Sequence, residues 1–86
     1  MENRDNRIKK MQYRAWYRGN RETDKILGNF AREKLNGFSD KELDQFEEVL
    51  ELQDVDIYDW VSGKRPVPKE LQENQVFKQM LEYKLV

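Results

Sequence analysis

The chain has 86 residues, of which 37% are hydrophobic and 38% are charged, and its formal net charge is −1. This length suits a single small domain. Cysteine and histidine are both absent, which excludes disulfides, thiolate or imidazole metal sites, and hydrolases that use a Ser–His or Cys–His pair. Because no apolar stretch reaches the roughly 18 residues that span a bilayer, we expect a soluble chain.

The charges are divided unevenly along the chain. Residues 1–37 carry ten Lys and Arg against five Asp and Glu, whereas residues 38–86 carry six against twelve. The two parts therefore have opposite charges of +5 and −6. This asymmetry indicates either a charged docking surface or ordinary solvated helix faces.

The first predicted helix covers about residues 5–18 and is apolar on two sides and basic on the third. One apolar side carries Ile8, Met11 and Ala15, the other carries Tyr13, Trp16 and Tyr17, and the basic side carries Arg7, Lys10, Arg14 and Arg18. The three aromatic residues belong either to the core or to an exposed surface. Aromatic residues mixed with arginine are typical of protein interfaces and of nucleic-acid platforms.

Gly19 separates this helix from a second one, about residues 21–35, which ends near Asn36-Gly37. The second helix is expected to bury Ile26, Leu27, Phe30 and Ala31. A glycine between two helices indicates a special requirement, which is either a positive φ angle or room for the backbone of a partner.

Three further helices complete the predicted fold. Ser39 and Glu42 form a capping box that opens the third helix, whose core face is Leu43, Phe46, Val49 and Leu50. A short fourth helix runs from Asp54 to Gly63 with Ile57, Trp60 and Val61 inward, and a fifth covers about residues 68–83 with Leu71, Phe77, Met80 and Leu81. We therefore predict an all-α, small single-domain five-helix bundle over residues 1–86, with residues 1–4 and 84–86 frayed.

Pairs of carboxylates occur on the polar faces of these helices, at Asp40/Asp44, Glu47/Glu51 and Asp56/Asp59. A catalytic dyad needs two carboxyl groups in a shared, partly buried site. Asp54-Val55-Asp56 lacks the glycine and the distal glutamate of an EF-hand, and helix N-capping explains these acids better. We expect no catalytic residue, no bound metal and no enzymatic activity.

The segment Arg18-Gly19-Asn20-Arg21-Glu22 resembles the Arg-Gly-x-x-Glu motif of the succinate dehydrogenase assembly factors. These small proteins promote the covalent attachment of FAD to the flavoprotein subunit. The similarity continues through residues 13–17, residues 26–31 and the acidic run that ends at Trp60, and it covers about residues 8–82. Asn20 departs from the family, where a threonine or an apolar residue is expected.

The resemblance implies a compact five-helix fold that docks onto another protein. It implies that Arg18, Gly19 and Glu22 line the docking surface, to which we add Asn20 within the motif and Arg14 and Asp24 as its neighbours. The implied partner is the flavoprotein subunit of succinate dehydrogenase or fumarate reductase. FAD is handled in that partner, so we expect no stably bound cofactor here. We expect a monomeric, transient, chaperone-like partner that does not insert into a membrane.

An alternative function is nucleic-acid binding, with the basic side of the first helix contacting phosphates. The overall pI of about 5.5 argues against it, because nucleic-acid-binding domains are usually basic. The N-terminal segment lacks the apolar run of a secretion signal and contains Glu2 and Asp5, unlike an acid-poor transit peptide. We therefore expect a bacterial cytoplasmic location, with the mitochondrial matrix as the second choice.

Overall fold

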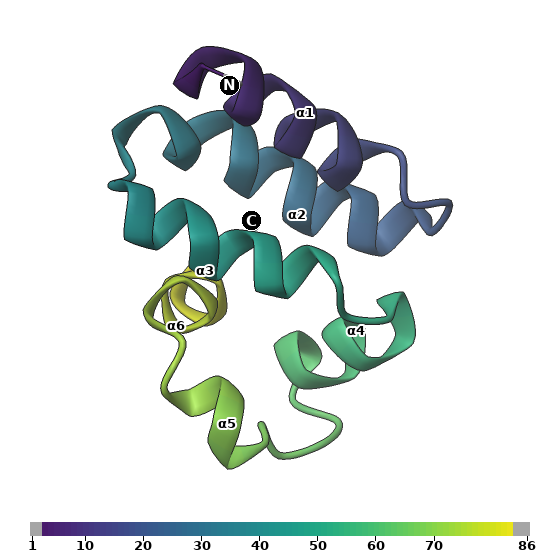
Figure 1. Cartoon of the computed structure of the whole chain (residues 1–86). Helices are drawn as coiled ribbons and strands as arrows, with labels where there is room; N and C mark the ends of the chain where they lie inside the picture. The colour runs from purple at the N-terminus through teal and green to yellow at the C-terminus, as the bar shows by residue number, and fades with distance from the viewer. Residues whose placement is uncertain (1–2, 84–86) are drawn as a thin grey trace.

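The computed structural model describes residues 3–83, which form helices joined by short loops (Figure 1). Their order is α1 (Arg4–Trp16), α2 (Arg21–Lys34), the 3₁₀ turn η1 (Leu35–Gly37), α3 (Asp40–Leu50), α4 (Asp54–Ser62), α5 (Lys69–Gln72) and α6 (Gln75–Glu82). Five of the α-helices have eight or more residues, and residues 3–83 contain no strand. The predicted all-α fold is therefore confirmed.

The terminal residues expected to fray fall partly within the described chain. Residues 1–2 and 84–86 lie outside it, whereas Asn3 is the N-cap of α1 and Arg4 is its first residue. Within residues 3–83, no helix has the length and apolar character needed to cross a bilayer.

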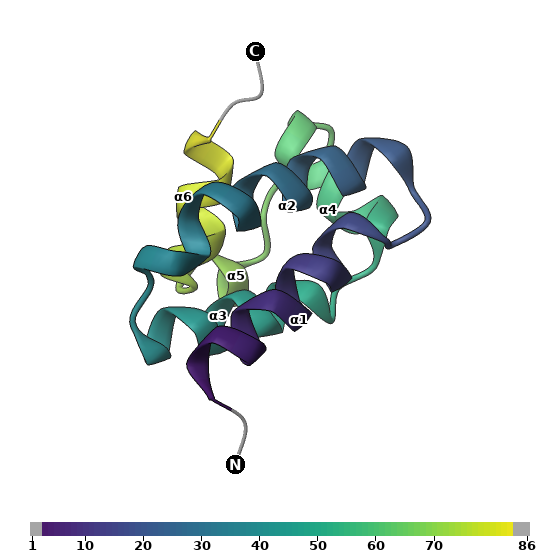
Figure 2. The ribbon, with the colours of Figure 1, turned by 90° about the horizontal axis from the view of Figure 1, so that it is seen from above.

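Helix α1 lies against both α2 and α3, and the three run side by side (Figures 1 and 2). α6 packs across α3 at a steep angle, so that it is seen end-on in Figure 1. α4 and α5 lie with α6 on the far side of α3 from α1. The loop between α1 and α2 is thereby brought close to the loop between α3 and α4.

Phe30 on α2 lies at the centre of the core. Its ring stacks on Phe46 of α3 at a centroid distance of 5.8 Å and meets Tyr83 edge-on at 5.6 Å. The predicted core residues of the first and third helices are all buried, namely Ile8, Met11, Ala15, Leu43, Phe46, Val49 and Leu50. The predicted core residues that are only partly buried are Ile26, Trp60, Val61, Leu71 and Leu81.

The helix ends follow the local sequence closely. The predicted capping box is present, because Ser39 Oγ accepts from the Glu42 N–H at 3.2 Å and the Glu42 carboxylate accepts from the Ser39 N–H at 2.9 Å. The latter bond lowers the pKa of Glu42. Gly63 ends α4 with a φ of 85°. Helix α1 ends at Trp16, two residues earlier than predicted, because Arg18 and Gly19 belong to the following loop.

The prediction of one continuous fifth helix over residues 68–83 is wrong, because the chain forms α5 and α6 with a break before Asn74. Asn74 is buried and caps α6 by accepting from the Phe77 N–H at 2.9 Å. Its amide also donates to the Gln45 carbonyl of α3 at 3.0 Å. An asparagine that satisfies backbone groups in this way competes with a continuous helix. The tertiary bond to α3 thus fixes the break.

Trp16 is half-buried and lies directly on the backbone of α2. A Cβ at Gly28 would come within 2.4–2.9 Å of three ring atoms of Trp16. The Arg32 guanidinium lies over the same ring, 6.0 Å from its centroid. The absence of a side chain at Gly28 therefore allows the close contact between α1 and α2.

Gly28→Ala should destabilise the protein, although alanine is the better helix former. Forcing an extra methyl group into a packed contact costs about 1–3 kcal/mol, against a gain in helix propensity of roughly 1 kcal/mol. In a Trp16→Ala background the same substitution should instead stabilise, because the obstructing ring is absent. Urea unfolding of the four proteins measures both effects. An equal loss in both backgrounds would rule out the Trp16 contact as the reason for the glycine.

Candidate docking site

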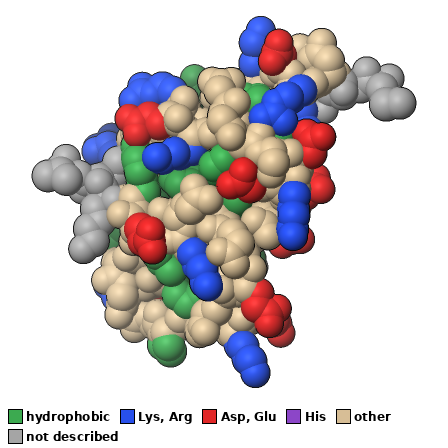
Figure 3. All heavy atoms as spheres, turned by 90° about the vertical axis from the view of Figure 1, so that its left-hand side faces the viewer, with side chains coloured by type: hydrophobic (Ala, Val, Ile, Leu, Met, Phe, Trp, Pro, Cys, Tyr) green, Lys and Arg blue, Asp and Glu red, His purple; other side chains and the backbone are tan. Residues whose placement is uncertain are grey.

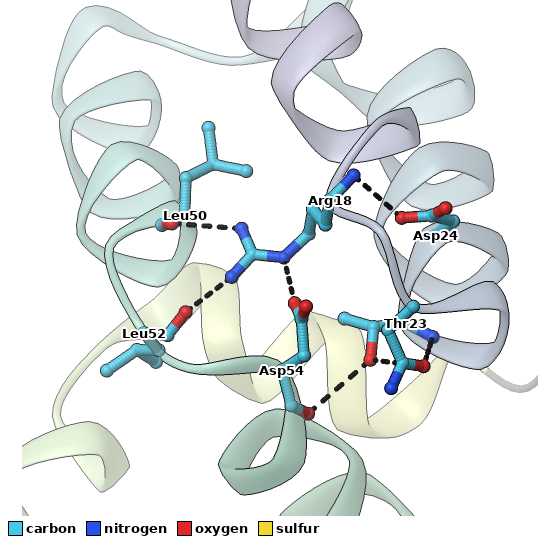
Figure 4. Close-up of polar contacts among 7 residues, drawn as sticks. Arg18, Thr23, Asp24, Leu50, Leu52 and Asp54 are labelled. Carbon is cyan, nitrogen blue, oxygen red and sulfur yellow. Dashed lines mark hydrogen bonds and ion pairs between the residues drawn. The ribbon is translucent and has the colours of Figure 1, made fainter.

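The loop between α1 and α2 is fixed by the guanidinium of Arg18, whose three nitrogens all bind acceptors from another part of the chain (Figure 4). Nε donates to the Asp54 carboxylate, Nη1 donates to the Leu50 carbonyl at 2.9 Å, and Nη2 donates to the Leu52 carbonyl. The side chain is only 11% exposed. Because the last carbonyls of a helix have no partner within it, Arg18 also caps α3 and joins it to the start of α4.

Other side chains of the motif extend this network. Asn20 caps α2 by accepting from the Thr23 N–H at 3.2 Å, and the buried Thr23 hydroxyl donates to the Asp54 carbonyl at 3.4 Å. The Asp24 carboxylate accepts from the Arg18 N–H at 2.9 Å. Throughout residues 3–83, every buried polar side-chain atom has a hydrogen-bond partner. Residues 18–24 are thereby tied to the loop between α3 and α4.

The basic side of α1 faces the acidic side of α3. The ion pairs are Arg4–Asp40 at 3.1 Å, Arg7–Asp44 at 2.5 Å, Arg7–Glu47 at 3.7 Å, Arg14–Glu51 at 2.9 Å, and Arg18–Asp54. The hydrogen bond to Asp44 raises the pKa of Arg7. Four arginines of the basic part of the chain are therefore paired with acids of the acidic part, and basic and acidic side chains are interspersed on the face in Figure 3.

Gly19 in the loop and Arg21 and Glu22 at the start of α2 are exposed to solvent. Gly19 has a φ of +96°, and a Cβ there would have no heavy atom within 4 Å. The positive φ therefore explains why position 19 is a glycine. No atom of residues 3–83 covers the outer side of this residue. Arg21 and Glu22 lie in the first turn of α2, and their side chains form no hydrogen bond or ion pair within residues 3–83.

The structure divides the six predicted docking residues into two groups. Those engaged in contacts within the molecule are Arg14, Arg18, Asn20 and Asp24. Gly19 and Glu22 present free surfaces to solvent. That these residues bind a partner stays a prediction, but the division assigns Arg18, Asn20 and Asp24 to holding the loop.

Thr23 and Asp54 belong to the site although sequence reasoning missed them. The expectation that Asp54 caps a helix is wrong, because Gln53 is the N-cap of α4 and Asp54 lies in its first turn. The position of Asp54 opposite Arg18 follows from how the helices pack, which helical spacing within one segment does not reveal. The hydrogen-bonded pairs Arg4–Asp40, Arg7–Asp44 and Arg14–Glu51 are 36 or 37 residues apart, and Arg18–Asp54 continues the same series.

The charged residues of the site are dispersed along the turn and the first turn of α2. No group of three or more His, Cys, Asp or Glu side chains is placed to hold a metal ion in the part of the chain described. The motif residues instead present a fixed turn with a cation and an anion side by side at Arg21 and Glu22.

Comparison with known proteins gives consistent matches. The family model described as the flavinator of succinate dehydrogenase matches residues 9–84. The chain is 34% identical over 82 residues to a protein named succinate dehydrogenase assembly factor 2, mitochondrial, of Schizosaccharomyces pombe, covering 95% of this chain and 59% of the relative. It is 37% identical over 67 residues to a protein of the same name from Mycosarcoma maydis, covering 78% and 28%.

A third relative is named FAD assembly factor SdhE, from Acetobacter pasteurianus. It is 34% identical over 64 residues, which cover 74% of this chain and 59% of the relative. The chain thus spans less than two thirds of the length of each of these three relatives.

The expectation of a bacterial cytoplasmic location is wrong, because the two fungal relatives are named as mitochondrial proteins. That expectation rested on acidic residues and on the absence of apolar runs. Charge and hydropathy govern the solubility of a folded domain. Domains of different compartments can have the same charge and hydropathy, so these properties do not indicate the compartment.

Arg18→Met should destabilise the protein by about 2–4 kcal/mol, because it leaves the Asp54 carboxylate and two carbonyls without their donor. Arg14→Met is the matched control. Its ion pair with Glu51 is exposed, so its loss should change the free energy of unfolding by about 0–1 kcal/mol. Chemical denaturation of both variants tests the difference. Equal effects would mean that Arg18 does not fix the loop.

Gly19→Ala should destabilise the protein by about 1 kcal/mol, because a Cβ disfavours a positive φ. Gly19→Arg should lose about the same amount, since the added atoms meet open space. Gly37→Ala provides the control, because its Cβ also meets open space and its φ is not positive. Thermal unfolding measures all three. A Gly19→Ala variant as stable as the wild type would contradict the conformational explanation.

Proposed function

Because the chain belongs to the flavinator family of succinate dehydrogenase, we propose that it binds the flavoprotein subunit of succinate dehydrogenase and promotes covalent attachment of FAD to that subunit. The names of the matched relatives, as assembly factors of succinate dehydrogenase or of FAD, support this proposal. The flavoprotein of fumarate reductase is a second partner of the same chemical class.

The observation that carries the proposal is the fixed turn at residues 18–22. Arg18 anchors the turn from inside, and Gly19, Arg21 and Glu22 face outward without partners in residues 3–83. A pre-ordered loop loses little conformational freedom on binding, which favours affinity. Charged groups such as Arg21 and Glu22 can make charge-assisted hydrogen bonds with the flavoprotein.

In this proposal the chemistry belongs to the flavoprotein and its FAD, and this chain contributes positioning. Cofactors carry the difficult chemistry, while proteins supply orientation and electrostatics. Holding reactive groups in the right geometry can contribute several kcal/mol to a rate, about 7–11 kcal/mol in the best cases. The chain then acts as a monomeric chaperone that leaves the mature enzyme, binds no FAD stably on its own and is not itself an enzyme.

The nucleic-acid alternative loses its main support in the structure. It requires the basic side of α1 to face phosphates, whereas Arg7, Arg14 and Arg18 are paired with acids of α3 and α4. Breaking those pairs to bind phosphate would leave the carboxylates without counterions, so protein docking is the better supported function.

Glu22→Gln should weaken binding to the flavoprotein about tenfold or more, because a charge-assisted hydrogen bond contributes roughly 1.5–3 kcal/mol. Its fold should be nearly unchanged, since Glu22 is exposed. Glu70→Gln is the matched control, because Glu70 is also exposed but lies on α5, away from the motif. Calorimetry measures affinity, and protein-bound flavin fluorescence in a denaturing gel measures attachment. If wild-type protein neither binds the flavoprotein nor raises its covalent flavin, the proposed function fails.

A further inference from the structure

The outer side of α1 carries a pair of aromatic rings that no other element covers. Tyr13 and Tyr17 are 66% and 72% exposed, and their ring centroids are 4.6 Å apart. They are two of the three large hydrophobic residues that are strongly exposed within residues 3–83, and the third is Val55. The basic side of α1 faces α3, and Trp16 faces α2, so the tyrosine pair points away from both neighbours.

This pair has the properties of an interface anchor. Tyrosine combines a large apolar ring with a hydroxyl, and it has few rotatable bonds to immobilise, which is why it is enriched at binding hot spots. The i, i+4 contact between the rings limits their freedom further. Only 37% of the residues are hydrophobic, yet the chain leaves these two rings in water. The rings therefore contribute nothing to its own core.

The surroundings of the pair indicate what it would meet. Lys9 is exposed one turn before Tyr13, and Arg21 is exposed just beyond the Gly19 turn, next to the exposed Glu22. Two cations and one anion therefore border the pair, and the pair leads directly into the motif at residues 18–22. The chemistry that fits this surface is an apolar patch bordered by carboxylates.

We infer that Tyr13 and Tyr17 are the apolar anchor by which this chain docks, that they bind an apolar patch with an acidic border on the flavoprotein subunit, and that they extend the docking surface from the Gly19 turn along α1. This inference rests on the proposed function, because it takes the flavoprotein as the partner. It assigns the affinity mainly to the two rings, whereas the motif sets the orientation.

Three variants test the anchor: Tyr13→Ala/Tyr17→Ala, Tyr13→Phe/Tyr17→Phe, and Val55→Ala as a control with a comparably exposed apolar side chain on another helix. The probe is the purified flavoprotein subunit of succinate dehydrogenase. We expect the double alanine variant to bind at least a hundredfold more weakly with little change in melting temperature, because hot-spot side chains dominate affinity. The double phenylalanine variant should bind within about fivefold of the wild type, and Val55→Ala should bind like the wild type.

The outcomes separate this inference from the proposal on which it rests. Wild-type binding that persists within twofold in the double alanine variant would overturn the anchor while leaving the proposed function in place. An equal loss in Val55→Ala would overturn the assignment of the anchor to α1. If the wild type does not bind the flavoprotein, both the inference and the proposed function are overturned.

Discussion

The hydrogen bonds of the Arg18 guanidinium determine how the two loops at the site lie. Arg18 belongs to the loop between α1 and α2, whereas its acceptors are the end of α3 and the start of α4. A charge held at 11% exposure needs such partners, because an unpaired buried charge is strongly destabilising. The turn at Gly19, the cap of α2 at Asn20 and the beginning of α4 at Asp54 therefore depend on one another.

This arrangement gives neighbouring residues of one short motif different tasks. Arg18 points inward and holds the turn, Gly19 reverses the chain with a positive φ, and Glu22 points outward. A substitution at Arg18 can therefore abolish binding by releasing the turn, even if the side chain never touches the partner. For each variant of the motif, stability therefore has to be measured together with binding.

The sequence could predict those features that depend on neighbours three or four residues apart. The stripe of Ile8, Met11 and Ala15 and the capping box at Ser39 are of this kind, and both are present. The break at Asn74 is not, because it depends on a hydrogen bond to Gln45. Helical spacing also grouped Trp16 with Tyr13 and Tyr17, but it could not tell that Gly28 admits one ring while the other two stay exposed.

The ion pairs between α1 and α3 have a consequence for α3 itself. The second half of α3 is acidic, with Glu47 and Glu48, and its last turn contains no basic residue. The partial negative charge at the C-terminal end of a helix dipole favours cations there, and Arg18 supplies one from outside. An isolated peptide of these eleven residues would be shorter than the roughly 12–15 residues that form a helix even marginally in water. In such a peptide, Glu47 and Glu48 would also lie without a counterion near the C-terminal end, where the helix dipole is already negative. The helicity of α3 therefore depends on its tertiary contacts, and Arg18 provides the one that offsets the charge at its C-terminal end.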